Sequence, residues 1–426
     1  MSKSNKSSSK SKTNKLKTNK LKANKSKTNK SKTKSKLNFL YKVPASILKT
    51  DYHHNDNIIN AAAKIIIKFQ KHNEVVVIAE MQSGKTDVMK RLIYIINNYR
   101  DQLANINVKI DKRGVYVVLS ASNINLKNQL KEKLSDIGHK VFHLNDIQLM
   151  LKNPSDYHSQ FVEMTDSSLI IFDECHCDAE CKKLIDKFRT KIETIAKSNH
   201  LSYHILGVSA TAYEQVIAGY PKVIMRPGDN YYGIGDMFKS IESTRPVLFQ
   251  AKNLEKLSKC YDLTREIDID NYYYIFRLPG KKNLEDEMIT NIIKIFGEYT
   301  KSTIETYIYD MSYKTNINQL INNAPSKPTI IFLKDKLRMG EYLNTRYVYL
   351  VHDNPNNCFA HTTVQSLLGR CCGYDKKSHQ TIIYCDLEKA QQHYDWIQNN
   401  YNSKHVPINS KYIKKSTGEI KENCFY

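Results

Sequence analysis

The chain has 426 residues, of which 41% are hydrophobic, and a formal net charge of +22 at pH 7. This length favours two or three domains, and no run reaches the roughly 18 apolar residues of a membrane-spanning helix. The basic N-terminus has no apolar core, so it does not read as a secretory signal. The nine cysteines lack the spacing of a disulfide framework, and we therefore expect an intracellular protein.

The N-terminal segment is strongly basic. Residues 1–36 contain fourteen lysines and no acidic residue, in a loose five-residue repeat. This composition cannot offset the entropy cost of ordering, so residues 1–37 are expected to form a disordered tail. The tail could be an electrostatic arm for nucleic acid, a nuclear address, or a solvated segment without a specific role. Part of the lysine excess could also reflect AT-rich coding DNA.

Strands and helices alternate through the first half of the remaining chain. A helix is predicted over 57–69, followed by a strand at Val75–Ile78 and a helix at Asp87–Ile96. Further strands are predicted at Gly114–Ser120, Val141–Leu144, Ser168–Phe172 and Tyr203–Val208, with a helix over Asn125–Leu134. Apolar strands separated by helices predict a parallel α/β sheet, in which ligands bind at the carboxyl ends of the strands.

A second alternating set follows an irregular-looking segment, Pro221–Thr244. We therefore expect one domain over 38–243, a second over 244–400, and a loose tail over 401–426. The strands of the second set are predicted at Tyr272–Phe276, Thr306–Tyr309, Thr329–Leu333, Tyr347–Val351 and Thr381–Cys385. Its helices are predicted at Leu284–Phe296, Thr363–Cys372 and Leu387–Asn399.

The first chemical motif follows the Val75–Ile78 strand directly. There Gln82 precedes Ser83, Gly84, Lys85 and Thr86, and a helix begins at once. Strand, tight turn and helix start are the arrangement that cradles a triphosphate on backbone N–H groups. Lys85 is expected to reach the β- and γ-phosphates, and the Thr86 hydroxyl to bind Mg²⁺. The usual first glycine of such a loop is replaced by Ala79, which is small enough for the turn.

A pair of carboxylates ends another predicted strand. Asp173 and Glu174 follow the apolar run Ser168–Phe172. Asp173 can hold Mg²⁺ through water, and Glu174 can act as the general base that polarises the water attacking the γ-phosphate. An ordinary solvated turn is the alternative. A zinc site is a further alternative, although the spacing of its candidate ligands does not match a usual one, these being Cys175, His176, Cys177 and Cys181.

Two hydroxyls follow the next predicted strand. Ser209 and Thr211 flank an alanine after Tyr203–Val208, and we expect them near the carboxylate pair. A Ser-Ala-Thr sequence is by itself more often a plain loop. It becomes informative here because it is the third motif in order, after Gly-Lys-Thr and Asp-Glu.

Together the motifs resemble those of the superfamily 2 helicases, over roughly residues 57–386. Ser83–Thr86 matches their motif I, Asp173–His176 their motif II as a DECH box, and Ser209–Thr211 their motif III. Gln365–Tyr374 resembles motif VI. The amino-acid sequences of several segments are most similar to those of helicases encoded by phages and large DNA viruses.

The resemblance implies two RecA-like parallel-sheet domains in tandem that bind ATP and Mg²⁺ in the cleft between them. Motif VI implies catalytic roles for Gln365 and for Arg370, as an arginine finger. The chain departs from the family pattern twice, because Gly373 stands where a second arginine is usual and Gln365 lies one residue too early. For Arg370 the alternative is an ordinary arginine on a helix surface.

Nucleic-acid contacts are less specific because motors of this family grip the backbone. Ser122 lies in the position of motif Ia, and Lys334, Lys336 and Arg338 follow a predicted strand. Each could equally be a solvated side chain. Tyr231 and Tyr232 could stack on bases, whereas Tyr272–Tyr274 are expected to pack in the core.

The expected function is therefore ATP-dependent movement along DNA or RNA, or strand separation. One alternative is a duplex translocase subunit of a nuclease or restriction-like complex. Another is a catalytically weak nucleic-acid clamp, motivated by the missing second arginine. Protein partners in replication, transcription or a nuclease complex are compatible with each of these readings, and no membrane partner is expected.

Overall fold

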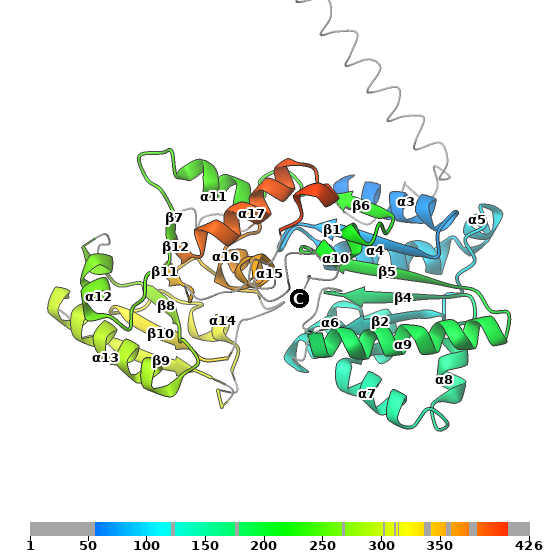
Figure 1. Cartoon of the computed structure of the whole chain (residues 1–426), viewed down its shortest axis with the longest axis horizontal. Coiled ribbons are helices and arrows are strands. Elements are labelled where there is room, and N and C mark those ends of the chain that lie inside the picture. The colour runs from blue at the N-terminus through cyan, green and yellow to red at the C-terminus, as the bar shows by residue number, and fades with distance from the viewer. Residues whose placement is uncertain are drawn as a thin grey trace, which may run out of the picture. The chain divides into compact units, whose positions relative to one another are not determined.

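The computed structural model describes residues 56–120, 124–174, 179–265, 269–300, 303–310, 312–313, 315–335, 342–354, 359–374 and 381–407. Within these ranges the chain forms two six-stranded sheets with helices packed on them (Figure 1). This confirms the predicted α/β class with two parallel sheets. None of the described helices is long and apolar enough to cross a membrane. The Lys-rich tail, residues 1–37, lies outside the described residues.

The first sheet has the strand order β3-β2-β4-β5-β1-β6, and all neighbouring strands are parallel. Its four inner strands are buried on both faces, which explains their continuous runs of Val, Ile and Leu. The strands are β1 (Glu74–Ala79), β2 (Val115–Leu119), β3 (Val141–His143), β4 (Ser168–Asp173), β5 (Tyr203–Ser209) and β6 (Lys222–Met225).

The second sheet has the order β7-β12-β11-β8-β10-β9 and is also parallel throughout. The five strands predicted for this half of the chain are all present, and β7 adds a short edge strand. The strands are β7 (Leu248–Gln250), β8 (Tyr273–Arg277), β9 (Glu305–Tyr309), β10 (Thr329–Leu333), β11 (Val348–His352) and β12 (Ile382–Cys385).

Helices connect the strands of both sheets. Those that precede or link the first-sheet strands are α3 (Asp56–Phe69), α4 (Lys85–Asn98), α5 (Arg100–Asn105), α6 (Ile124–Lys133), η1 (Ser135–Lys140), α7 (Leu144–Lys152), α8 (His158–Glu163), α9 (Ala179–Ser198) and α10 (Tyr213–Ile217). The later ones are α11 (Ile234–Ser240), α12 (Leu257–Thr264), α13 (Lys282–Tyr299), α14 (Ile317–Leu320), α15 (Ala360–Gln365), α16 (Leu367–Arg370), α17 (Leu387–Gln398) and η2 (Ser403–His405).

Each sheet has a hydrophobic core beneath its helices. Phe161 of α8 and Phe188 of α9 pack on the first sheet, and Figure 1 shows α9 running alongside β4. Phe296 of α13 packs in the same way on the second sheet. A further core cluster contains Met81, from the loop after β1, together with Leu368 of α16. The phosphate loop and the motif VI segment therefore share one buried cluster.

Motif VI is not the single helix that was predicted over Thr363–Cys372. Helix α15 ends at Gln365 and α16 begins at Leu367, because Ser366 leaves helical geometry with φ −81° and ψ −145°. The break brings the Val364 carbonyl oxygen so close to Gly369 that a Cβ there would lie 2.0 Å from it. Only glycine fits this contact.

Two other expectations are wrong in part. The segment Pro221–Thr244 is not irregular, since it contains the edge strand β6 and the helix α11, whose N-terminus is capped by the Asp236 carboxylate at 3.0 Å from the Gly233 nitrogen. Tyr401 is only 1% exposed and packs edge-on against Trp396, so the predicted loose tail does not begin there. The domain boundary expected after residue 243 stays a prediction.

Candidate functional site

The predicted phosphate loop is a tight turn between β1 and α4. Gly84 has φ +105°, a left-handed conformation that side chains rarely adopt, and the first residue of α4 is Lys85. The Ser83 hydroxyl donates to the Glu80 carbonyl at 2.7 Å and closes the turn. This local geometry leaves Gly84, Lys85 and Thr86 at the wall of a cavity.

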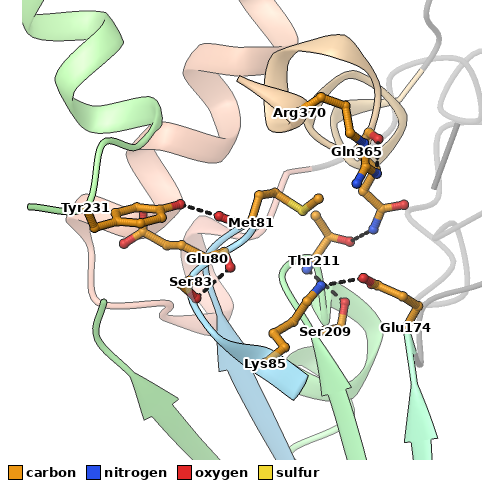
Figure 2. Close-up of polar contacts among 10 residues, drawn as sticks. All are labelled: Glu80, Met81, Ser83, Lys85, Glu174, Ser209, Thr211, Tyr231, Gln365 and Arg370. Atoms are coloured by element: carbon orange, nitrogen blue, oxygen red, sulfur yellow. Dashed lines mark hydrogen bonds and ion pairs between the residues drawn. The ribbon is translucent and has the colours of Figure 1, made fainter. Parts of the chain in front are cut away.

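The two predicted carboxylates lie at the end of β4, facing the loop. Glu174 follows the strand with φ +56°, a turn that re-aims its side chain. Its carboxylate forms an ion pair with the Lys85 ammonium (Figure 2). The two side chains are only 11% and 7% exposed, so the pair is shielded from solvent.

Asp173 is the second carboxylate of this strand end. Desolvation, reinforced by the neighbouring Glu174, raises the pKa of Asp173 to about 7, against the opposing effect of Lys85. Asp173 and Thr86 line the same cavity and offer one carboxylate and one hydroxyl. This all-oxygen set suits Mg²⁺, which takes few protein ligands and keeps several waters or phosphate oxygens. Among the described residues no group of three His, Cys, Asp or Glu could form a metal cage.

The Ser-Ala-Thr motif lies next to the carboxylates because β4 and β5 are neighbours in the sheet. The Ser209 hydroxyl accepts a hydrogen bond from the Thr211 backbone N–H at 2.9 Å. The Thr211 hydroxyl in turn accepts one from the Gln365 side-chain amide at 2.6 Å (Figure 2). The structure thus joins motif III directly to motif VI.

Arg370 is buried, so the alternative reading as a surface arginine is wrong. The residue is 2% exposed and lines the cavity of the phosphate loop. Its Nη2 donates to the Gln365 carbonyl at 2.7 Å, and its own carbonyl accepts from the Gln82 amide at 3.3 Å. One contact therefore fixes the guanidinium against Gln365, and the other ties the Arg370 backbone to the phosphate loop.

The cavity has a volume of about 450 Å³. The residues that line it include Gln82, Gly84, Lys85, Thr86, Asp173, Glu174 and Arg370. Other predicted site residues within the described ranges are buried and do not line it, namely Ser83, Ser209, Thr211 and Gln365. Two further cations, Lys90 and Lys133, line it and were missed in the sequence because isolated helix lysines carry no pattern. A polyphosphate suits this density of positive charge.

The loop is also tied to residues that the sequence did not assign to it. The Tyr231 hydroxyl donates to the Met81 carbonyl at 2.5 Å, and the Tyr374 hydroxyl to the Ser83 carbonyl at 3.3 Å. Tyr232 and Gly373 form an antiparallel bridge beside these contacts. Tyr231 is therefore engaged with the phosphate loop, and this contact does not fit its proposed role in base stacking.

Gly373 explains why this motif VI lacks its second arginine. Its φ is +133°, and a Cβ there would lie 3.2 Å from the Gln82 side-chain oxygen. Any larger residue would be strained and would press on the phosphate loop. The local backbone conformation therefore favours glycine at this position over the second arginine of the family pattern.

Several predicted positions lie outside the described residues, namely Ser122, Lys336, Arg338, Cys175, His176 and Cys177. The proposed zinc ligands therefore remain a hypothesis. Lys334 forms an ion pair with Glu285 at 2.6 Å, which competes with a phosphate contact. Tyr273 and Tyr274 are 6% and 0% exposed, which confirms their prediction as packing residues. The prediction is wrong for Tyr272, which precedes β8 and is 37% exposed.

Comparison with known proteins yields one similar sequence and a set of similar folds. No protein-family model matches the chain. The "Uncharacterized protein L594" of Acanthamoeba polyphaga mimivirus is 58% identical over 391 residues, which is 92% of this chain and 100% of that protein. Two crystal structures of Escherichia coli HrpB, described as a DExH-box NTPase and as a DEAH/RHA helicase, give TM-scores of 0.48 and 0.45 at 11% and 10% identity. The matches cover 80% and 79% of this chain but only 43% of HrpB in each case.

Proposed function

This chain belongs to the family of the mimivirus protein, and on the geometry of its cavity we propose that it is a nucleic-acid-dependent ATP hydrolase of the superfamily 2 helicase type. The observation that carries the proposal is the convergence of Lys85, Glu174 and Arg370 on one cavity. Lys85 begins α4, Glu174 directly follows β4, and Arg370 ends α16. They supply a phosphate-binding cation, a base and a second cation, which is the set that phosphoryl transfer requires.

Binding begins at the phosphate loop. Backbone N–H groups at Gly84, Lys85 and Thr86 hold the phosphates, with Ser83 bracing the turn and Gln82 at its edge. Thr86 and Asp173 are the residues that would hold Mg²⁺, which neutralises phosphate charge when bound.

The Lys85–Glu174 pair links binding to the chemistry. An incoming triphosphate competes for the Lys85 ammonium because it carries more negative charge than a single carboxylate. Glu174, once released, accepts a proton from the water that attacks the γ-phosphate. As the bond between the water oxygen and the γ-phosphorus forms, the bond from the γ-phosphorus to the β–γ bridging oxygen breaks, which yields ADP and phosphate. Lys85 and Arg370 stabilise the charge on the transferring group.

In the proposed mechanism, the hydrogen bond between Thr211 and Gln365 couples ATP hydrolysis to nucleic-acid binding. A change in the γ-phosphate alters the surroundings of Arg370, whose guanidinium is bonded to Gln365, and Gln365 is bonded to Thr211. Ser209 and Thr211 then pass the change towards a DNA or RNA backbone. Ser122, Lys336 and Arg338 are proposed to contact that backbone, within lobes spanning residues 38–243 and 244–400.

The test is ATP hydrolysis measured with single-stranded DNA, duplex DNA and RNA, each over a salt series. We expect stimulation by one of these polymers that falls steeply with salt, because backbone contacts release counterions. Lys85→Ala should abolish nucleotide binding, and Glu174→Gln should bind nucleotide without turning it over. Lys197→Ala, in an exposed pair with Glu193, is the charge-matched control and should behave as wild type. Hydrolysis that survives in both Lys85→Ala and Glu174→Gln would refute the assignment.

A nucleotide-regulated nucleic-acid clamp is the second candidate, and Gly373 is the observation that favours it. With a single arginine in motif VI, hydrolysis can be slow or lost while nucleotide binding persists. Nucleotide binding that changes nucleic-acid affinity in wild type, without measurable turnover on any polymer, selects the clamp over the motor.

A further inference from the structure

A buried ion pair lies beneath the motif VI segment. Arg277 ends β8, and Asp353 directly follows β11, the neighbouring strand in the second sheet. The Arg277 Nε donates to the Asp353 Oδ1 at 2.8 Å. The two residues are 6% and 0% exposed, so neither charge is compensated by solvent.

The second oxygen of Asp353 reaches the motif VI helix. Oδ2 accepts a hydrogen bond from the Leu367 backbone N–H at 3.1 Å. Leu367 is the first residue of α16, whose last residue is Arg370. Because the chain leaves helical geometry at Ser366, the N–H groups at the start of α16 need acceptors from elsewhere in the protein, and Asp353 supplies one of them.

Fully burying a carboxylate is costly unless its oxygens are satisfied. Here three donors serve the same group, since the Asn354 backbone N–H also donates to Oδ1 at 3.0 Å. What the carboxylate adds is a fixed link between the sheet and the segment that carries Arg370.

We propose that Asp353 is a positioning residue for the arginine finger, held in place by Arg277. The carboxylate fixes the start of α16, so that Arg370 enters the cavity three residues later in one orientation. Neither residue lines the cavity of the phosphate loop, so they act through α16 and not on the nucleotide. This inference rests on the proposed hydrolase function, because it gives Arg370 a catalytic role.

The test is a double-mutant cycle between Asp353→Asn and Arg370→Ala in the full chain. An asparagine has the same shape but cannot accept hydrogen bonds on both sides, so the start of α16 shifts. We expect Asp353→Asn to lower kcat by about 100-fold, a loss typical of small misplacements in an active site. Nucleotide affinity, set by the phosphate loop, should change little. In the Arg370→Ala background the same change should have almost no further effect.

Arg277→Lys provides a second variant that keeps the charge but loses the Nε geometry. It should lower kcat less than Arg277→Ala does. If Asp353→Asn does not fold, Arg277→Lys takes its place in the double-mutant cycle with Arg370→Ala. The control is Arg189→Gln, which breaks the pair with Glu74 at the start of β1 and should lower the melting temperature without changing kcat.

The outcomes separate this inference from the function it rests on. Absence of hydrolysis in wild type, on every polymer, overturns both. An active wild type in which the Asp353 and Arg370 effects multiply, or in which Asp353→Asn has normal kcat, overturns the positioning role alone. The positioning role is supported if Asp353→Asn lowers kcat in the wild-type background but not in the Arg370→Ala background, and if kcat is normal in Arg189→Gln.

Discussion

The Gln365 side-chain amide donates a 2.6 Å hydrogen bond to the Thr211 hydroxyl. The two residues are 3% and 1% exposed and lie 154 positions apart in the chain. Thr211 follows β5, a central strand of the first sheet, and Gln365 ends α15, a helix that lies in the chain between β11 and β12 of the second sheet. The bond therefore joins the two sheets at the point where the proposed hydrolase must transmit nucleotide state.

Gln365→Ala should uncouple hydrolysis from nucleic acid. Loss of the amide leaves the buried Thr211 hydroxyl without this donor, at a stability cost of about 1–3 kcal/mol. We expect nucleotide affinity close to wild type and weaker stimulation of ATP hydrolysis by the activating polymer. Steady-state kinetics with and without that polymer provide the measurement. Thr211→Val should reproduce the effect, and the double variant should be no worse than either single one.

Gly373→Arg should impair the enzyme, although it restores the arginine that the family pattern contains. The backbone at φ +133° disfavours any side chain, and a Cβ would press on Gln82 of the phosphate loop. We expect a loss on the order of 1–3 kcal/mol in the free energy of unfolding, together with slower hydrolysis. Chemical denaturation and kcat measure the two effects. Gly373→Ala separates backbone strain from charge, and a faster enzyme in the arginine variant would contradict the argument.

Lys133→Ala should weaken nucleotide binding through loss of charge. Lys133 is exposed, lines the cavity and lowers the pKa of Asp173 through its charge. Its removal should raise KM for ATP by about fivefold at low ionic strength, and by less at high salt, where the interaction is screened. Lys131→Ala removes the same charge from the same helix outside the cavity lining. Equal effects of the two variants would show that only overall charge matters.

Glu80→Gln should change how stability depends on pH. Burial raises the pKa of Glu80 to about 7 from its ordinary 4.5, with Asp236 acting in the same direction and Arg226 opposing it. Between these two values the folded protein binds more protons than the unfolded chain, so wild-type stability falls as pH rises through this window. The neutral glutamine avoids this loss.

We therefore expect Glu80→Gln to be more stable relative to wild type at pH 8 than at pH 5. Melting temperatures at the two pH values give the comparison. A difference between the proteins that is the same at both pH values would mean that Glu80 ionises normally in the folded state.

Local pattern was enough to predict most strands and the main elements of the site. The run Val75–Ile78 could only be a buried strand, and Gly84 could be assigned to the turn because few residues tolerate its backbone. The same reasoning failed at Thr363–Cys372, where a break at Ser366 depends on acceptors and close contacts supplied by distant segments. It failed also at β6, a four-residue edge strand too short to show a pattern.

The sequence alone determined the parallel α/β class and the meeting of Lys85, Thr86, Asp173 and Glu174, because parallel strands of one sheet end at a common edge. The tertiary structure decided the rest: that Arg370 is buried beside that edge, that Gly373 disfavours a second arginine, and that Asp353 and Thr211 each accept a hydrogen bond from the motif VI segment. These relationships join residues far apart in the chain, and they arise from packing, which no local periodicity encodes.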